Sequence, residues 1–362
     1  VFKGTKKRTA RIIAQSLESV GGYLNAFTSK EHTCYYARVL DEHIEKAVDV
    51  LSDLILHPEF DKDELEKEKA IILEEIKNYE DEPDEIIHDD FEKLLFKPHP
   101  LGYNILGTRE SLENLNKKEI ENYKKIHYSS DNIIICAAGN IPHQKLVDLS
   151  YKYFGELKKT KNGYKRVSPK VKKKAEVLKI EKPIQQAHLC YGSYAFNVSD
   201  ERRFPLLILN TLLGDGMSSR LYQSVREKKG LAYSVYSFAN LLTDIGSFGV
   251  YAGIDKCKID LSLLLIEKEL EKIKKVPITE SELKRTKAQV KGNMVLGLES
   301  MSNRMMRLAK SEIYYRKYQS VDSLIEKINK VSIESIQKVA NELFDLDKFK
   351  LIAYIPINNN TN

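Results

Sequence analysis

The sequence lacks several features that mark membrane and secreted proteins. No apolar run reaches the roughly 18 uncharged residues of a membrane span, and 42% hydrophobic with 30% charged residues is typical of a globular chain. Only four cysteines are present, far apart and without a Cys-x-x-Cys pair: Cys34, Cys136, Cys190 and Cys257. This spacing argues against a zinc knuckle or a disulfide framework and for a reducing compartment. We expect each cysteine to be a small core residue, and we expect no membrane partner.

Nothing at the start of the chain resembles a signal or transit peptide. The chain opens with Val1 rather than Met, and we therefore expect that residues are missing upstream. We expect a cytoplasmic protein, with an organelle matrix as the alternative. The length of 362 residues suits two domains better than one core.

Complete catalytic signatures are also missing. The chain contains no His-Glu-x-x-His, no His-x-x-Glu-His and no Gly-x-Ser-x-Gly. Glu31-His32 and Glu42-His43 look like halves of the second pattern, but neither pair has the earlier histidine. We interpret both histidines as structural or surface residues.

The net charge is +6, and basic residues cluster between positions 158 and 174. One interpretation is a nucleic-acid patch. The alternative is a solvated linker, because the run contains Gly163 and Pro169, has only Tyr164 as an aromatic, and lies between two apolar-rich regions. We expect a basic linker over residues 161–176 and no nucleic-acid partner.

Residues 1–160 show both helical and strand periodicity. Alternation rich in Thr, Tyr and Phe predicts two strands within residues 23–40, and a short apolar run predicts a buried strand at 133–138. Apolar spacing of about 3.6 residues predicts helices over residues 8–20, 42–56, 61–79, 111–126 and 143–154.

Residues 177–362 repeat this order. Strands are expected at residues 186–194, 233–237 and 246–252, and helices at 204–213, 218–228 and 261–275. The segment from His57-Pro58 and the segment from Val276-Pro277 share Pro, Leu, Lys and Ala in the same order, and a capping box follows each proline. We predict an α+β fold of two homologous domains, 1–160 and 177–362, each a mostly antiparallel sheet packed with helices.

Two carboxylates stand out on the helix at 61–79. Glu68 and Glu75 are seven residues apart and share one face, which is otherwise apolar, whereas Glu74 should point outward. A buried, unpaired carboxylate is costly and needs a partner or a cation. Periodicity alone favours the simpler alternative, in which the pair lies at the edge of the stripe and reaches solvent or pairs with Lys or Arg.

Several blocks, in order, resemble the pitrilysin/insulinase-type zinc metallopeptidases. Phe2-Lys3-Gly4-Thr5 is similar to the segment that follows the family's His-Phe-Leu-Glu-His motif. Further blocks are Gly21-Gly22-x-x-Asn25-Ala26-Phe27-Thr28-Ser29-x-Glu31-x-Thr33, Glu66-x-Glu68-Lys69 through Glu74-Glu75-Ile76, His99-Pro100-Leu101-Gly102, Leu106-Gly107-Thr108 and Ala138-Gly139-Asn140. In the second half, Ser218-Ser219-Arg220-Leu221 and Arg226-Glu227-x-x-Gly230-Leu231-Ala232-Tyr233 resemble the two-domain processing-peptidase branch.

The resemblance implies a Zn²⁺ site and a peptidase activity. It makes Glu75 the third zinc ligand and Glu68 the second carboxylate that supports the site. The two histidine ligands and the catalytic glutamate would lie just before Val1, so residues 1–362 alone should neither bind zinc in the family manner nor hydrolyse peptides. Three protein ligands and a water are what a catalytic zinc needs.

The resemblance also implies how a peptide is bound. Asn25, Ala26, Phe27 and Thr28 should lie on an edge strand that pairs with an extended or unfolded peptide substrate. Arg226 and Tyr233 would stabilise the developing oxyanion, and in the two-domain branch this pair arrives from a partner subunit. A homodimer, or a heterodimer with a homologous subunit, is therefore implied.

The second copy departs from the first at the carboxylates. Thr286 and Asn293 fall opposite Glu68 and Glu75, which suggests that the second domain carries no metal. Two hypotheses follow: a zinc-dependent endopeptidase, or a non-catalytic homologue that acts as a partner or scaffold subunit. The retained carboxylates favour the first.

Overall fold

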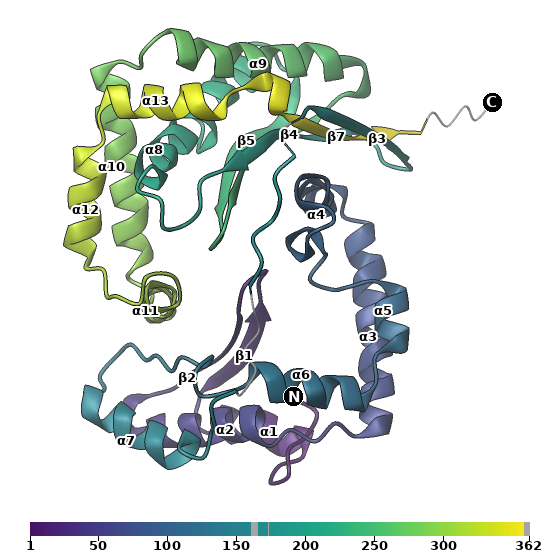
Figure 1. Ribbon diagram of the computed structural model, residues 1–362, viewed down its shortest axis with the longest axis vertical. Coiled ribbons are helices and arrows are strands. Elements are labelled where there is room, and N and C mark those ends of the chain that lie inside the picture. The colour runs from purple at the N-terminus through teal and green to yellow at the C-terminus, as the bar shows by residue number, and fades with distance from the viewer. Residues whose placement is uncertain (161–165, 173, 358–362) are drawn as a thin grey trace. The chain divides into compact units, whose positions relative to one another are not determined.

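The computed structural model describes residues 1–160, 166–172 and 174–357 (Figure 1). The chain divides into two compact units. The first contains residues 1–77, 105–167 and 298–318, and the second contains 78–104, 168–297 and 319–362. Residues 161–165 and 173 of the predicted linker lie outside the described residues, and the predicted domain bounds stay a prediction.

The first unit is built on a hairpin of two strands, β1 (Tyr23–Thr28) and β2 (Thr33–Arg38), as expected. Residues 78–80, which form the last turn of the helix α3 (Lys62–Glu80), belong to the second unit. The helices are α1 (Ala10–Glu18), α2 (Ile44–Leu56) after the 3₁₀ turn η1 (Asp41–His43), α3 (Lys62–Glu80), α5 (Arg109–Asn114), α6 (Lys117–His127), α7 (His143–Phe154) and α11 (Met301–Tyr315).

Strand alternation places the core of the first unit between the hairpin and two helices. Leu24 of β1 pairs with Ala37 of β2, and both side chains pack toward α1 and α2. Five buried side chains form the centre of this core: Ile13, Leu17, Ala47, Val50 and Leu54. Burying a side chain of the size of Leu54 stabilises the fold by roughly 1.5–3 kcal/mol.

The strand predicted at residues 133–138 is wrong. In the part of the chain that the structure describes, these residues pair with no strand, although Ile135 packs against buried Val48, Leu149 and Phe154. A run of apolar residues predicts that the segment is buried. It does not show that the segment hydrogen-bonds to a neighbouring strand.

The second unit contains a five-stranded sheet in the order β3-β7-β4-β6-β5, in which β3 and β7 alone are parallel. The strands are β3 (Glu176–Lys182), β4 (Ala187–Ala195), β5 (Ala232–Leu241), β6 (Gly246–Ile254) and β7 (Lys350–Pro356). The helices are α4 (Pro83–Phe96), α8 (Arg203–Gly214), α9 (Ile259–Lys275), α10 (Glu280–Gly297), α12 (Val321–Lys330) and α13 (Ile333–Leu343). Short turns η2 (Pro100–Gly102), η4 (Lys256–Lys258) and η5 (Leu346–Lys348) and a π-helix, η3 (Tyr222–Glu227), complete it.

Both faces of this sheet are buried at β4, β6 and β7. Leu189 and Tyr191 of β4 point into a core shared with α8, α9 and α13, whereas Cys190 between them points to the opposite face. That second face is covered by α4, whose Ile87 and Phe91 are fully buried. The edge strand β3, in contrast, is largely exposed.

The two units exchange helices along the chain. Helix α4 comes from the first half of the sequence but belongs to the second unit, where Lys350 Nζ donates to Leu94 O over 2.8 Å. Helix α11 comes from the second half but belongs to the first unit, where Cys34 Sγ lies 3.8 Å from Met306 Sδ. Each unit is thus completed by a helix from the other half of the sequence.

The predicted α+β class and the internal repeat are confirmed. In each half two antiparallel strands are followed by a 3₁₀ turn, a helix, a proline and a further helix: η1, α2 and α3 in the first, and η4, α9 and α10 in the second. Thr279 and Glu282 form the predicted capping box of α10. No helix in the described ranges is long and apolar enough to cross a membrane.

The cysteines differ in burial. Cys190 is fully buried, Cys34 and Cys136 are half-buried, and Cys257 is exposed. The expectation of a core position is therefore wrong for Cys257, which lies in the 3₁₀ turn η4 rather than in a strand or helix interior.

Candidate functional site

The helix α3 carries the two predicted carboxylates. Its start is fixed by Asp61, whose Oδ1 accepts from the backbone N of Asp63 (2.9 Å) and of Glu64 (3.1 Å). From there Glu68 and Glu75 fall two turns apart on one side of the helix.

The predicted inward-facing residues of α3 do lie on its covered side, but they are less buried than predicted. Leu65, Ile72, Ile76 and Tyr79 are half-buried, but no residue of the helix is fully buried. The two carboxylates lie at the edge of the stripe, as periodicity alone favoured, and not in a buried pair. Periodicity identifies the covered side of a helix, whereas the depth of cover depends on how much of the chain packs on it.

Glu68 is held by an ion pair. Its Oε1 lies 2.7 Å from Lys3 Nζ, and its side chain is 35% exposed. The simpler alternative, a half-buried carboxylate paired with lysine, describes Glu68 as it stands.

Glu75 has a different environment. It is exposed, and within the described residues no hydrogen bond or ion pair to its carboxylate is found. Its neighbour Glu74 points outward, as predicted, and pairs with Lys77 on the next turn. Within the described residues, the Glu75 carboxylate therefore has no partner, whereas the carboxylates of Glu68 and Glu74 are each paired with a lysine.

These carboxylates fit part of a zinc site. A catalytic zinc needs three protein ligands, and no group of three or more His, Cys, Asp or Glu side chains converges in the described part of the chain. Glu75 can serve as one ligand, and Glu68 can orient it or a water, so the remaining ligands must come from elsewhere.

Strand β1 offers an open edge that includes the predicted substrate-binding residues. Ser29 N donates to His32 O over 2.8 Å, so alternate pairs of the hairpin are hydrogen-bonded, and Ala26 and Thr28 direct their backbone groups away from β2. The amide of Ala26 donates instead to Asn25 Oδ1 over 2.7 Å. Asn25, Phe27 and Thr28 are exposed, and Ala26 is half-buried.

The tip of this hairpin is anchored by residues that the sequence patterns did not reveal. The Glu31 side chain is 3% exposed and pairs with Arg166. Tyr314 of α11 also contacts it: burial, with the Glu31 carboxylate alongside, raises the pKa of Tyr314 to about 12. No local sequence pattern predicts this role of Glu31, because Arg166 and Tyr314 lie far away in sequence.

Arg226 and Tyr233 lie together in the second unit. The guanidinium carbon of Arg226 is 5.5 Å from the centre of the Tyr233 ring and 4.8 Å from that of Tyr222. Arg226 lies within the helix predicted at 218–228. This helix is the π-helix η3, in which Lys228 N donates to Gln223 O. Gly230, at φ 58°, turns the chain into β5, and Tyr233 is 77% exposed.

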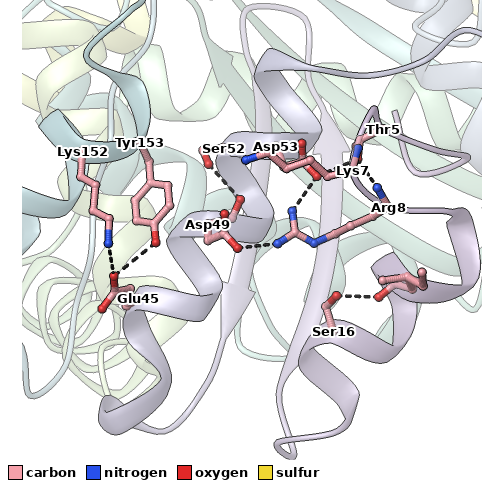
Figure 2. A network of polar contacts seen from close by, with 11 residues as sticks. Thr5, Lys7, Arg8, Ser16, Glu45, Asp49, Ser52, Asp53, Lys152 and Tyr153 are labelled. Atoms are coloured by element: carbon pink, nitrogen blue, oxygen red, sulfur yellow. Dashed lines mark hydrogen bonds and ion pairs between the residues drawn. The ribbon is translucent and has the colours of Figure 1, made fainter.

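A polar network fastens the start of the chain to α2 (Figure 2). Thr5 Oγ1 and Arg8 Nη1 each donate to Asp53 Oδ2 over 2.6 Å, and Arg8 also pairs with Asp49. Near the start of α2, Glu45 accepts from Lys152 and Tyr153. The sequence patterns gave no hint of the Asp53 network, because its members are more than 40 residues apart.

Comparison with known proteins identifies the family. Residues 1–109 match the family described as "Insulinase (Peptidase family M16)", and residues 114–290 match "Peptidase M16 inactive domain". The chain is 43% identical over 346 residues to "Uncharacterized zinc protease YmxG" of Bacillus subtilis, covering 96% of this chain and 84% of the relative. It is 37% identical over 351 residues to an "Uncharacterized zinc protease" of Streptomyces coelicolor, covering 95% and 76%. The chain belongs to the insulinase family of peptidases, family M16.

Solved structures show the same fold. A protease from Helicobacter pylori superposes with a TM-score of 0.90 at 24% identity, covering 98% of this chain and 87% of that one. A peptidase M16 inactive domain from Pseudomonas fluorescens superposes with a TM-score of 0.91 at 20% identity, covering 98% and 86%. At these identities the likeness speaks for the architecture alone.

Proposed function

We propose that the intact protein is a zinc-dependent endopeptidase that acts on extended or unfolded peptides. The observation that carries the proposal is the arrangement on α3, where the uncommitted carboxylate of Glu75 lies two turns from Glu68. Relatives named zinc proteases support the same assignment. Zinc is then the resident metal, and Glu75 is its ligand from this part of the chain.

The residues of the chain divide the remaining tasks. The outward backbone groups of Ala26 and Thr28 bind an extended peptide by strand addition, which favours unfolded substrates because a folded one has no free strand. Bound zinc supplies a water acidified enough to attack a carbonyl at neutral pH. Arg226 and the Tyr233 hydroxyl stabilise the negative charge that develops on that carbonyl oxygen.

The proposed roles of Arg226 and Tyr233 also imply how the protein assembles. We infer a dimer, either of this chain or with a homologous subunit, in which Arg226 and Tyr233 act on the partner's substrate. Their exposure leaves them available for this, since Tyr233 is 77% exposed and Arg226 is half-buried.

A second candidate function is a non-catalytic partner subunit. Two observations favour it: residues 114–290 match a domain described as inactive, and Glu68 is already occupied by Lys3. Such a subunit would retain the fold and the β1 edge but hold no zinc.

The test uses the full-length protein with its native upstream residues. We expect about one zinc per chain and cleavage of an unfolded peptide, with both lost in Glu75→Gln. Glu74→Gln is the matched control, because Glu74 is next in sequence but points outward. Zinc content is read by metal analysis and activity by peptide mass spectrometry.

If the full-length protein holds no zinc and cleaves nothing, alone or with a homologous subunit, the peptidase assignment is wrong and the subunit assignment stands. Equal losses in the two variants would show that Glu75 has no special place on α3.

A further inference from the structure

The turn that follows β1 is tied together by its own hydrogen bonds. Ser29 Oγ lies within hydrogen-bond distance of three atoms of His32: Nδ1 at 2.9 Å, O at 3.1 Å and N at 3.2 Å. The ring of Phe27 packs edge-on against His32, with 5.9 Å between the ring centres. Because these contacts join the turn to the last residues of β1, a displacement of the turn also displaces Thr28.

Glu31, inside this turn, buries its carboxylate against two partners. Its side chain is 3% exposed and pairs with Arg166, and the Tyr314 hydroxyl of α11 hydrogen-bonds to it. A carboxylate withdrawn from water is stable only while a cation and a hydrogen-bond donor compensate for the lost hydration. The two partners therefore hold the turn in one place.

Helix α11 contacts the hairpin through one side. Met306, Lys310 and Tyr314 follow each other at intervals of four residues, so their side chains project in the same direction. Met306 Sδ lies 3.8 Å from Cys34 Sγ of β2, the Lys310 charge acts on the histidine of the turn, and Tyr314 contacts Glu31. Strand β2 and the turn are thus placed by the same side of α11.

The outward backbone groups of β1 end where this anchored turn begins. They belong to Ala26 and Thr28, and Thr28 directly precedes the turn. An added strand must bond to both residues at once, and a hydrogen bond weakens steeply as its angle departs from linear. The position of the turn therefore decides whether Thr28 can bond to a peptide that already lies along Ala26.

We propose that Glu31 is a positioning residue for peptide binding: Tyr314 and Arg166 hold it, and through it the end of β1, where Thr28 pairs with an extended peptide. The proposal rests on the proposed function, in which the β1 edge binds peptides by strand addition, but it requires no metal. Glu31 touches no substrate and acts through the turn alone. Helix α11, from the second half of the sequence, thereby contributes to peptide binding at a strand from the first half.

The experiment measures binding of a fluorescein-labelled peptide of Thr, Val and Lys residues, a composition that favours an extended chain, by fluorescence anisotropy. The full-length protein is used with EDTA present, so that a bound peptide is not cleaved. Glu31→Gln removes the charge that faces Arg166, Tyr314→Phe removes the hydroxyl, and a double variant combines the two changes. Glu42→Gln is the matched control, because Glu42 is exposed beyond the other end of β2 and pairs with the neighbouring His43.

We expect Glu31→Gln to bind the peptide about tenfold more weakly and Tyr314→Phe about three- to tenfold more weakly. The double variant should bind no more weakly than Glu31→Gln, because both changes remove the same contact. At equal peptide concentration, the Thr28 amide should lose in Glu31→Gln the protection from hydrogen exchange that the peptide gives it in the parent. Glu42→Gln should stay within about twofold of the parent, since an exposed ion pair contributes little.

Unchanged peptide affinity in a folded Glu31→Gln would overturn the proposal, and so would an equal loss in Glu42→Gln. If Glu31→Gln does not fold, Tyr314→Phe decides, because it keeps both the carboxylate and the ring. A different failure is a parent that binds no peptide, or binds equally well a peptide N-methylated at alternate residues, which cannot pair as a strand. That result overturns strand addition in the proposed function, and the role of Glu31 with it.

Discussion

Arg226 and Tyr233 lie on separate elements yet meet through a cation–π contact, with 5.5 Å between the guanidinium carbon and the ring centre. If the pair stabilises an oxyanion, the hydroxyl is the group that matters. Tyr233→Phe keeps the ring against Arg226 and removes only that donor. We expect kcat to fall about 10²–10³-fold with little change in KM or zinc content.

Tyr222→Phe is the matched control for that prediction, because Tyr222 also stacks on Arg226. Its kcat should stay near that of the parent. An unchanged kcat in Tyr233→Phe would mean that the tyrosine is a surface residue of β5 and that Arg226 works without it.

At the scale of residues, the sequence predicted candidate site residues more readily than the environments of their side chains. The motif matches singled out Glu68, Glu75, Arg226 and Tyr233 as candidates, and the spacing placed both glutamates on one helical face. Their partners were not predictable, because Lys3 meets Glu68 only after the chain folds back.

At the scale of elements, α4 contacts its sheet through a half-buried histidine, His88. His88 Nε2 lies 2.9 Å from the Tyr236 hydroxyl, and its ring packs against Phe238 and Tyr251. Cys190 Sγ lies 3.9 Å from its Nδ1. Burial lowers the pKa of His88, and the nearby carboxylates of Asp89 and Asp84 oppose that shift.

The lowered pKa has a definite sign for stability. His88 is neutral in the folded chain and takes up a proton more readily when unfolded, so its contribution is complete above about pH 6.5, the unfolded value. The contribution is lost as the pH falls below that value. We expect the urea midpoint to fall between pH 7.5 and pH 5, and to fall less in His88→Phe.

His143→Gln, at an exposed position at the start of α7, is the control for that pH dependence. A slope in His88→Phe as steep as in the parent would assign the acid sensitivity to other groups. His188 is one such group: burial also lowers its pKa, and it lies 2.8 Å from the Tyr251 hydroxyl.

The elements themselves followed largely from sequence where periodicity was strong. The hairpin of β1 and β2, the helices α2 and α3, and the strands β4 to β6 lie close to their predicted positions. A helix was also predicted at 218–228, and the structure has one there, the π-helix η3. Apolar spacing does not separate i+4 from i+5 hydrogen bonding, so the type of this helix could not be predicted.

At the scale of the whole molecule, the exchange of helices links regions that are far apart in sequence. Phe91 of α4 is fully buried against the sheet of the second unit. We expect Phe91→Ala to lower the free energy of unfolding of that unit by about 3–5 kcal/mol. Phe91→Leu, which keeps most of the volume, should lower it by less than about 1.5 kcal/mol.

Hydrogen exchange locates this loss. Amides of β4 and β7 should lose protection in Phe91→Ala, while those of β1 and β2 should keep theirs, because the hairpin belongs to the other unit. Equal loss in both sets would show that the two units unfold as one.

The exchange of α4 also has a consequence for biosynthesis. Leu94 bonds to Lys350, which follows it by 256 residues. At a translation rate of roughly 5–20 residues per second, α4 leaves the ribosome about 10–50 s before β7, the last strand that it packs against. Cys190 of β4, which lies against His88 of α4, follows that histidine by 102 residues. Until β4 emerges, the apolar face of α4 has no strand of its sheet to pack against, so the nascent chain exposes an apolar helix that a chaperone would shield.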